Sequence, residues 1–104
     1  MKEISIIRET LIEELDRNRR SLRAYELECE KLPKGSVTVR VRGSRAYCYL
    51  KYRDGERTIT KYVGPSVIVE EELRAQVARR KELESVIKRL KQEGRFIEKA
   101  LRHS

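Results

Sequence analysis

The segment from Ser36 to Gly64 constrains the fold most, because its apolar and polar residues alternate around two short breaks that contain glycine. Alternation with a period of two predicts strands that are buried on one face. The breaks, Gly43-Ser44 and Asp54-Gly55, are two-residue turn sequences that admit the positive φ angles of primed hairpin turns. The segment therefore predicts a three-stranded antiparallel β-meander over about residues 36–63.

These turns also predict a register, which pairs Arg42 with Arg45 in the first hairpin and Arg53 with Glu56 in the second. The first predicted face is aliphatic and holds Val37, Val39, Val41, Ala46, Cys48, Leu50, Tyr52 and Ile59, with Lys61 out of pattern. The second is basic and aromatic and holds Thr38, Arg40, Arg42, Tyr47, Tyr49, Lys51, Arg53, Thr58, Thr60 and Tyr62. We expect the aliphatic face to pack on helices and the other face to stay open.

Apolar residues recur every three or four positions on both sides of this segment, which predicts two long amphipathic helices over about residues 4–32 and 69–101. The first seam reads Ile4, Ile7, Leu11, Leu15, Asn18, Leu22, Tyr25, Cys29 and Leu32, and Pro33 is expected to end the helix. The second seam reads Leu73, Val77, Arg80, Leu83, Ile87, Leu90, Gly94, Ile97 and Leu101. Because two such narrow stripes are not stable apart, we expect an antiparallel coiled-coil hairpin, packing across a dimer, or both.

Three features of these helices carry separate expectations. Asn18 on the first seam either fixes the register or points to water, and Gly94 on the second marks a close helix approach or a local bend. The acidic trio at residues 70–72 is expected in the first turn of the second helix, where carboxylates favour the positive end of the helix dipole. Three consecutive residues fan around a helix, so the trio is not predicted to converge on a metal or a substrate.

Length and composition predict one α+β domain over residues 1–104 that is soluble and basic. Charged residues make up 40% of the chain and the net charge is +8, with seven basic and only two acidic side chains between residues 36 and 64. No apolar stretch has the length of a signal peptide or a membrane span, so a cytoplasmic protein without membrane contact is expected. Cys29 and Cys48 fall at apolar positions and are expected to be reduced core residues.

The sequence predicts no enzyme. His103, the single histidine, lies beside the C-terminus, and two cysteines without a nearby histidine provide neither a zinc site nor a nucleophilic pair. The five glycines are scattered and form no phosphate-cradling loop. We therefore expect no catalytic residue, cofactor, metal or small-molecule substrate.

The basic and aromatic face predicts a nucleic-acid-binding surface. Arginine and lysine neutralise phosphates, and tyrosine stacks on bases or donates a hydrogen bond to a phosphate. The residues predicted to contact nucleic acid are Arg40, Arg42, Arg45, Tyr47, Tyr49, Lys51, Arg53 and Tyr62. The same pattern also suits a face covered by a protein partner, or a solvated face stabilised by aromatic pairs across the strands. The alternative function is an oligomeric coiled-coil scaffold or adaptor for protein partners, with a homodimer favoured.

Two resemblances accompany this pattern. The stretch GSVTVRVRGSRAYCYLKYRDGERTITKYVG resembles the arm-type DNA-binding domains of tyrosine recombinases, which place a three-stranded sheet face on DNA. That resemblance implies DNA contacts by Arg40, Arg42, Tyr47, Tyr49, Lys51 and Arg53. The order helix, LPKGS, YCYLKYRDG, KYV and a helix with RRKELE resembles a family of small uncharacterised prokaryotic helix–β-meander–helix proteins. The second resemblance implies the architecture and no activity. Members often carry a cysteine-rich insertion, which the Gly43-Ser44 turn replaces here.

Overall fold

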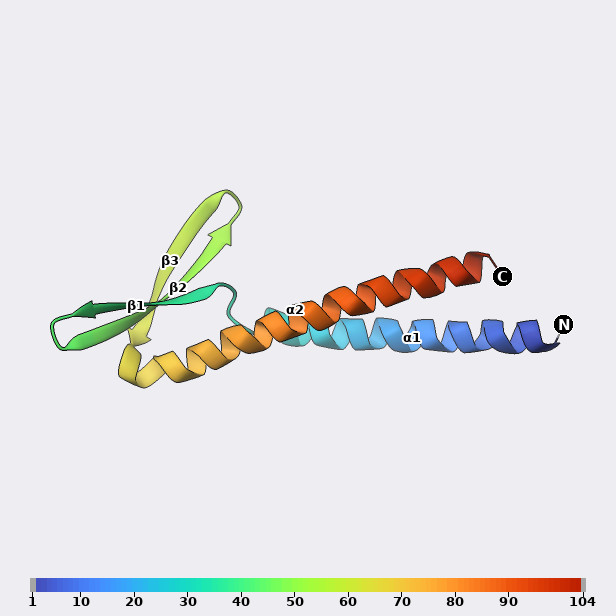
Figure 1. The fold of residues 1–104 in the computed structure, drawn as a ribbon, viewed down its shortest axis with the longest axis horizontal. Helices are drawn as coiled ribbons and strands as arrows, with labels where there is room; N and C mark the ends of the chain where they lie inside the picture. The colour runs from blue at the N-terminus through green and yellow to red at the C-terminus, as the bar shows by residue number, and fades with distance from the viewer. Residues whose placement is uncertain (1, 104) are drawn as a thin grey trace. The chain divides into compact units, whose positions relative to one another are not determined.

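The computed structural model describes residues 2–103, with the side chains of residues 5–103, as two helices flanking a three-stranded antiparallel sheet (Figure 1). This confirms the predicted α+β class. The elements are α1 (Lys2–Glu30), β1 (Ser36–Arg42), β2 (Arg45–Asp54), β3 (Arg57–Pro65) and α2 (Ser66–Arg102). The sheet order is β1-β2-β3, so β2 is central. No helix within residues 2–103 is long and apolar enough to cross a membrane.

The chain forms two compact units. Residues 1–29 and 83–104 make the first, which we call the helical unit, and residues 30–82 make the second, which we call the sheet unit. The helical unit holds α1 and the C-terminal half of α2, and the sheet unit holds the three strands and the N-terminal half of α2. The single domain over residues 1–104 stays a prediction.

The register of the first hairpin is confirmed. Arg42 pairs with Arg45, Val39 with Cys48 and Val37 with Leu50. Gly43, the first loop residue, has a φ of +62°, whereas Ser44 has no positive φ. A positive φ at the first of two loop positions alone is the pattern of a type II′ turn, which matches the twist of the flanking strands.

The predicted register of the second hairpin is wrong by two residues. Asp54 pairs with Arg57 and Arg53 with Thr58, so the loop is Gly55-Glu56 and Asp54 belongs to the strand. Gly55 has a φ of +64° at the first loop position, as in a type II′ turn. The predicted Asp-Gly loop would need a positive φ at both positions in a type I′ turn, and the glycine alone supplies it here. A shift by two residues leaves every side chain on its predicted face.

A bulge in β3 departs from regular pairing. Tyr49 pairs with Tyr62 and Cys48 with Gly64, so Val63 is the extra residue between the two pairs. Residues two apart in a regular strand point to the same face. The extra residue therefore lets β3 direct Tyr62 to the open face and bring the buried Gly64 under α2. A Cβ atom on Gly64 would lie 3.0 Å from Cγ1 of Val69, so a larger residue here would have to displace the Val69 side chain.

The core of the sheet unit lies between the aliphatic sheet face and α2, as predicted. Cys48 and Leu50 from β2 pack with Leu73 and Val77 from α2, and all four are buried. The partly buried side chains around them are Val37, Val39, Tyr52 and Val69. Burial of a side chain the size of leucine or valine stabilises a fold by about 1.5–3 kcal/mol. Val41 was predicted for this face, but it lies at the C-terminal end of β1, next to the first turn, and is 70% exposed.

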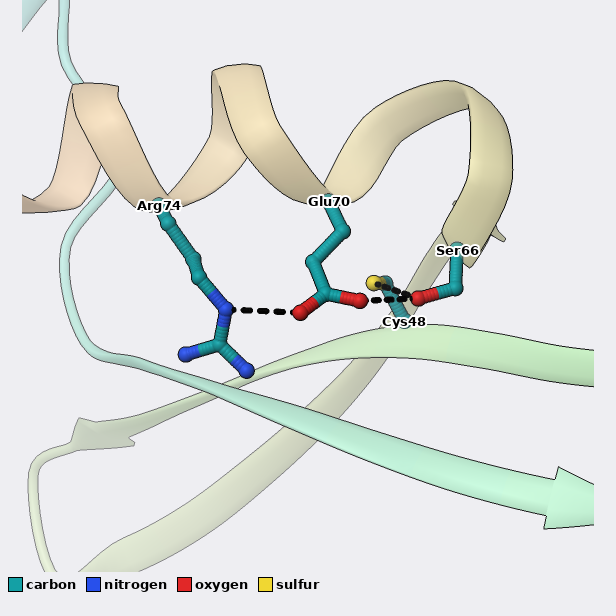
Figure 2. Close-up of polar contacts among 4 residues, drawn as sticks. All are labelled: Cys48, Ser66, Glu70 and Arg74. Atoms are coloured by element: carbon teal, nitrogen blue, oxygen red, sulfur yellow. Dashed lines mark hydrogen bonds and ion pairs between the residues drawn. The ribbon is translucent and has the colours of Figure 1, made fainter.

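Helix α2 begins at Ser66, one turn earlier than predicted, and this corrects the interpretation of its acidic residues. The first turn holds no carboxylate, so the acidic trio at residues 70–72 does not meet the dipole there. Glu70 instead accepts hydrogen bonds from the Ser66 hydroxyl and from Arg74 Nε, the latter at 2.9 Å (Figure 2). The Ser66 bond first, and the Arg74 bond second, hold the pKa of Glu70 below its ordinary value. Cys48 Sγ lies 3.5 Å from Ser66 Oγ, so this polar chain fastens the start of α2 to the central strand.

Helix α1 ends at Glu30, two residues before the predicted end, and Leu32 and Pro33 follow it. Arg80, the charged member of the predicted second seam, donates from Nη1 to the Leu32 carbonyl oxygen at 2.7 Å. This hydrogen bond satisfies a backbone carbonyl just beyond the end of α1. It takes the place of the apolar contact expected at a seam position. The seam position is thus used for a backbone hydrogen bond within the sheet unit.

The two helices lie side by side and antiparallel in the helical unit (Figure 1). Arg8 donates to the Leu101 carbonyl at 3.0 Å, and Arg19 forms an ion pair with Glu98 at 2.9 Å. In this unit, the buried apolar side chains at predicted seam positions are Leu15, Cys29, Leu83 and Ile97. The predicted seam position Ile4 lies outside the described side chains. Both cysteines are buried thiols without a disulfide, which confirms that prediction.

Asn18 and Gly94 meet at the seam. Asn18 is 4% exposed and donates from Nδ2 to the Leu90 carbonyl at 2.9 Å, so it does not point to water. A Cβ atom on Gly94 would lie 2.8 Å from Asn18 Oδ1, closer than real Cβ contacts come. Of the two expectations for Gly94, the close helix approach is therefore confirmed.

Replacing Gly94 with alanine is expected to destabilise the helical unit by about 1–2 kcal/mol, because overpacking and loss of the buried amide contact outweigh the gain in helix propensity. The measurement is urea denaturation followed by far-ultraviolet circular dichroism. In an Asn18→Ala background, where the space is open, the same replacement is expected to stabilise by up to about 1 kcal/mol. Equal effects in both backgrounds would contradict the contact.

Candidate nucleic-acid interface

The residues predicted to bind nucleic acid share the sheet face opposite Leu50 and Cys48. Cross-strand pairs share a face, and the register pairs Arg40 with Tyr47, Arg42 with Arg45 and Tyr49 with Tyr62. Lys51 and Arg53 continue the same side of β2. We call this surface the basic tyrosine face, and it consists of Arg40, Arg42, Arg45, Tyr47, Tyr49, Lys51, Arg53 and Tyr62.

Three tyrosine rings form a cluster at the middle of the face. The Tyr62 ring lies 5.4 Å from the Tyr49 ring and 6.2 Å from the Tyr47 ring, with tilts of 57° and 58°. Tilted aromatic pairs at these separations contribute about 0.5–1.5 kcal/mol beyond their buried area. The register of the second hairpin makes this cluster, since it sets Tyr62 opposite Tyr49 just before the bulge at Val63. Tyr62 is 50% exposed and the other two rings are half-buried, so ring surface remains accessible.

The Arg40 guanidinium lies over the Tyr49 ring, with Cζ 4.6 Å from the ring centroid. A cation over an aromatic face at an exposed site gains about 0.5–1 kcal/mol. Arginine keeps its N–H donors in the plane of the guanidinium group, so stacking leaves them available for a phosphate. The contact therefore positions a charged donor beside the aromatic cluster.

The charge of the face is uncompensated. It carries five cationic side chains, and none of them has an ion-pair partner among the residues that the structure describes. The acidic residues of the sheet lie elsewhere, Asp54 on the opposite side of β2 and Glu56 in the loop. Arg57 and Lys61 also point to the opposite side, because their partners are Asp54 and Leu50. The positive potential is thus concentrated around the tyrosines.

Two threonines outside the predicted set also lie on this face. Thr58 and Thr60 pair with Arg53 and Lys51, so β3 adds two hydroxyl groups to the same side. Sequence reasoning assigned both threonines to this face without a role.

No cluster of three or more cysteine, histidine, aspartate or glutamate side chains suited to a metal exists within the described part of the chain.

The fold and this face define a small α+β protein in which one sheet face is covered by a helix and the other is basic and aromatic. The chain belongs to the family described as a domain of unknown function, DUF6788, whose model matches residues 2–75. The match spans α1, the whole sheet and the start of α2. No curated protein and no solved structure matches the chain. The family agrees with the predicted likeness to uncharacterised proteins, and the likeness to recombinase arm domains stays a prediction.

Proposed function

We propose that this protein is a non-enzymatic nucleic-acid-binding module whose contact surface is the basic tyrosine face. The observation that carries the proposal is the three-tyrosine cluster, which is partly exposed and surrounded by five cationic side chains that have no carboxylate partner among residues 5–103. Phosphate neutralisation supplies affinity without regard to sequence. Aromatic rings supply stacking surfaces that accept any base.

The arrangement favours single strands over a regular duplex. Bases in a single strand are free to stack on a tyrosine, whereas bases in a duplex are already stacked on one another. The cations at both ends of the cluster, Arg45 beside Tyr47 and Lys51 beside Tyr49, would track the backbone on either side of the stacked base. The scaffold beneath is the α2 helix, which packs on the opposite sheet face through Leu73 and Val77.

Fluorescence anisotropy with labelled single-stranded DNA, duplex DNA and RNA tests this proposal directly. We expect micromolar or tighter binding at low salt, tightest for a single strand, and a steep fall in the binding constant as salt rises. Absence of binding to all three nucleic acids at low salt would end the proposal.

Replacing Tyr62 with alanine is expected to weaken single-strand binding by about 5- to 150-fold, because one base–aromatic stack contributes about 1–3 kcal/mol. Tyr62→Phe keeps the ring and is expected to bind within about twofold of the unmodified protein if stacking is the interaction. Anisotropy titration at one fixed salt concentration measures both variants. An equal loss in both would instead assign the hydroxyl group as the phosphate contact, and no loss in either would exclude this ring from the interface.

The second candidate is an oligomeric scaffold in which helices of two copies pack together. It is favoured by apolar side chains of α1 that stay open to solvent, among them Ile7 on the predicted seam at 60% exposure and Ile12 at 50%. A coiled coil between copies would cover such residues. Sedimentation velocity decides this candidate, since a dimer supports it and a strict monomer at high concentration contradicts it.

A further inference from the structure

A second concentration of positive charge lies on the helical unit, where α1 and α2 run side by side. A groove of about 200 Å³ is lined by Asn18, Arg19, Leu22, Lys91, Gly94, Arg95 and Glu98. A second hollow on α1 shares Arg19 and Leu22 with it and adds Arg20, Arg23 and Glu26. We call the two together the helical groove.

The close approach of the helices at Gly94 gives the groove its floor. Gly94 lacks a side chain, Asn18 fills the contact against it, and Leu22 lies half-buried beside them. The rims are long cationic side chains, Arg19 and Arg23 from α1 and Lys91 and Arg95 from α2. The heptad spacing that makes the seam thus also places cations on both sides of one shallow channel.

Only part of this charge is neutralised within the unit. Arg19 pairs with Glu98 at 2.9 Å, and Arg20 pairs with Asp16 at 3.3 Å. The remaining cations are Arg23, Lys91 and Arg95, which are exposed and have no ion-pair partner among residues 5–103. Three unpaired cations around one channel favour an anionic occupant.

We propose that the helical groove binds phosphate groups of a nucleic-acid backbone, as a second contact surface in addition to the basic tyrosine face. This inference rests on the proposed function. Phosphates require cationic donors and little else, which the rims supply. An acidic helix of a protein partner would need a row of apolar anchor sites, and Leu22 is the single large apolar side chain in the lining.

The test is the salt dependence of single-strand and duplex binding by Arg23→Gln/Arg95→Gln. The slope of log K against log salt is negative. Each lost phosphate contact makes it shallower, by about 0.9 on duplex DNA and about 0.7 on a single strand. We expect the double variant to reduce the magnitude of this slope by about 1.8 on the duplex and to weaken binding several-fold at low salt. The matched control is Arg17→Gln/Arg89→Gln, which removes the same charge from exposed positions of the same two helices outside the groove lining.

Three outcomes decide the inference. A reduced slope for the groove variant with an unchanged slope for the control supports it. Equal slopes for both variants, while the Tyr62 substitution still weakens binding, overturn it and leave the proposed function standing. A labelled poly-glutamate peptide is the third probe. If it binds the unmodified protein as tightly as the oligonucleotide does, and no longer binds the groove variant, the inference is overturned and an acidic protein segment is assigned to the groove. Circular dichroism of each variant checks that the helices are intact.

Discussion

Replacing Gly35 with alanine is expected to destabilise the sheet unit by about 3 kcal/mol or more. Gly35 has a φ of +123°, a region that residues with a side chain rarely adopt, and such strain costs about 1–3 kcal/mol. A Cβ atom there would overlap the backbone carbonyl oxygen of Lys51 and lie 3.0 Å from Cβ of Tyr52. Overpacking against a backbone atom adds a similar cost, because the central strand cannot move aside without losing its own pairing.

Tyrosine fluorescence during urea denaturation measures this effect in the sheet unit, since four of the five tyrosines lie on β2 and β3. The control is Gly43→Ala. Gly43 also has a positive φ, +62°, but has open space where a Cβ would be, so a loss of only about 1 kcal/mol is expected. Similar losses in the two variants would show that the close approach at Lys51 does not constrain the sheet.

Reversing two charges on the basic tyrosine face, in Arg45→Glu/Lys51→Glu, is expected to weaken nucleic-acid binding by about 100-fold or more at low salt. The change removes two phosphate contacts and adds two carboxylates that repel the backbone. Both residues lie on β2 on either side of the tyrosine cluster, so any strand that stacks on the rings passes them. Anisotropy with a labelled single strand measures the loss.

The sheet contains its own control for this experiment. Arg57→Glu/Lys61→Glu makes the same change in net charge with one arginine and one lysine, on exposed β3 positions that point to the opposite sheet face. We expect this variant to lose no more than about fivefold, from the lower net charge alone. Comparable losses from both variants would mean that overall charge, and not one face, attracts the nucleic acid.

Local patterns predicted the two sheet faces well, because side-chain alternation survives errors in turn placement. The second hairpin shows this, since the two-residue error at Gly55 changed each cross-strand partner and moved no side chain to the other face. The bulge at Val63 could not be predicted, because it depends on where α2 needs a glycine and not on the strand sequence itself. Its outcome is Gly64 opposite Cys48, whereas Tyr62, just before the bulge, lies beside Tyr49 on the predicted face.

The ends of the helices were less predictable, for a physical reason. Val67 and Ile68 are 92% and 73% exposed, so the first turn of α2 has no apolar periodicity that would identify it as helix. The hydrogen-bonded chain from Cys48 through Ser66 to Glu70 joins residues from two elements and has no sequence pattern. The groove cations Arg23, Lys91 and Arg95 resembled an ordinary solvated face, because only the pairing of the helices brings them together.

The placement of the thiols makes local opening of the two units separately measurable. Cys29 belongs to the helical unit and Cys48 to the sheet unit, and they are 5% and 0% exposed. A sulfhydryl reagent reaches each sulfur only when the surrounding packing opens, so the modification rate at each position reports the opening of its own unit. A bound oligonucleotide that protects one sulfur and not the other would identify which half of the molecule is stabilised by the ligand.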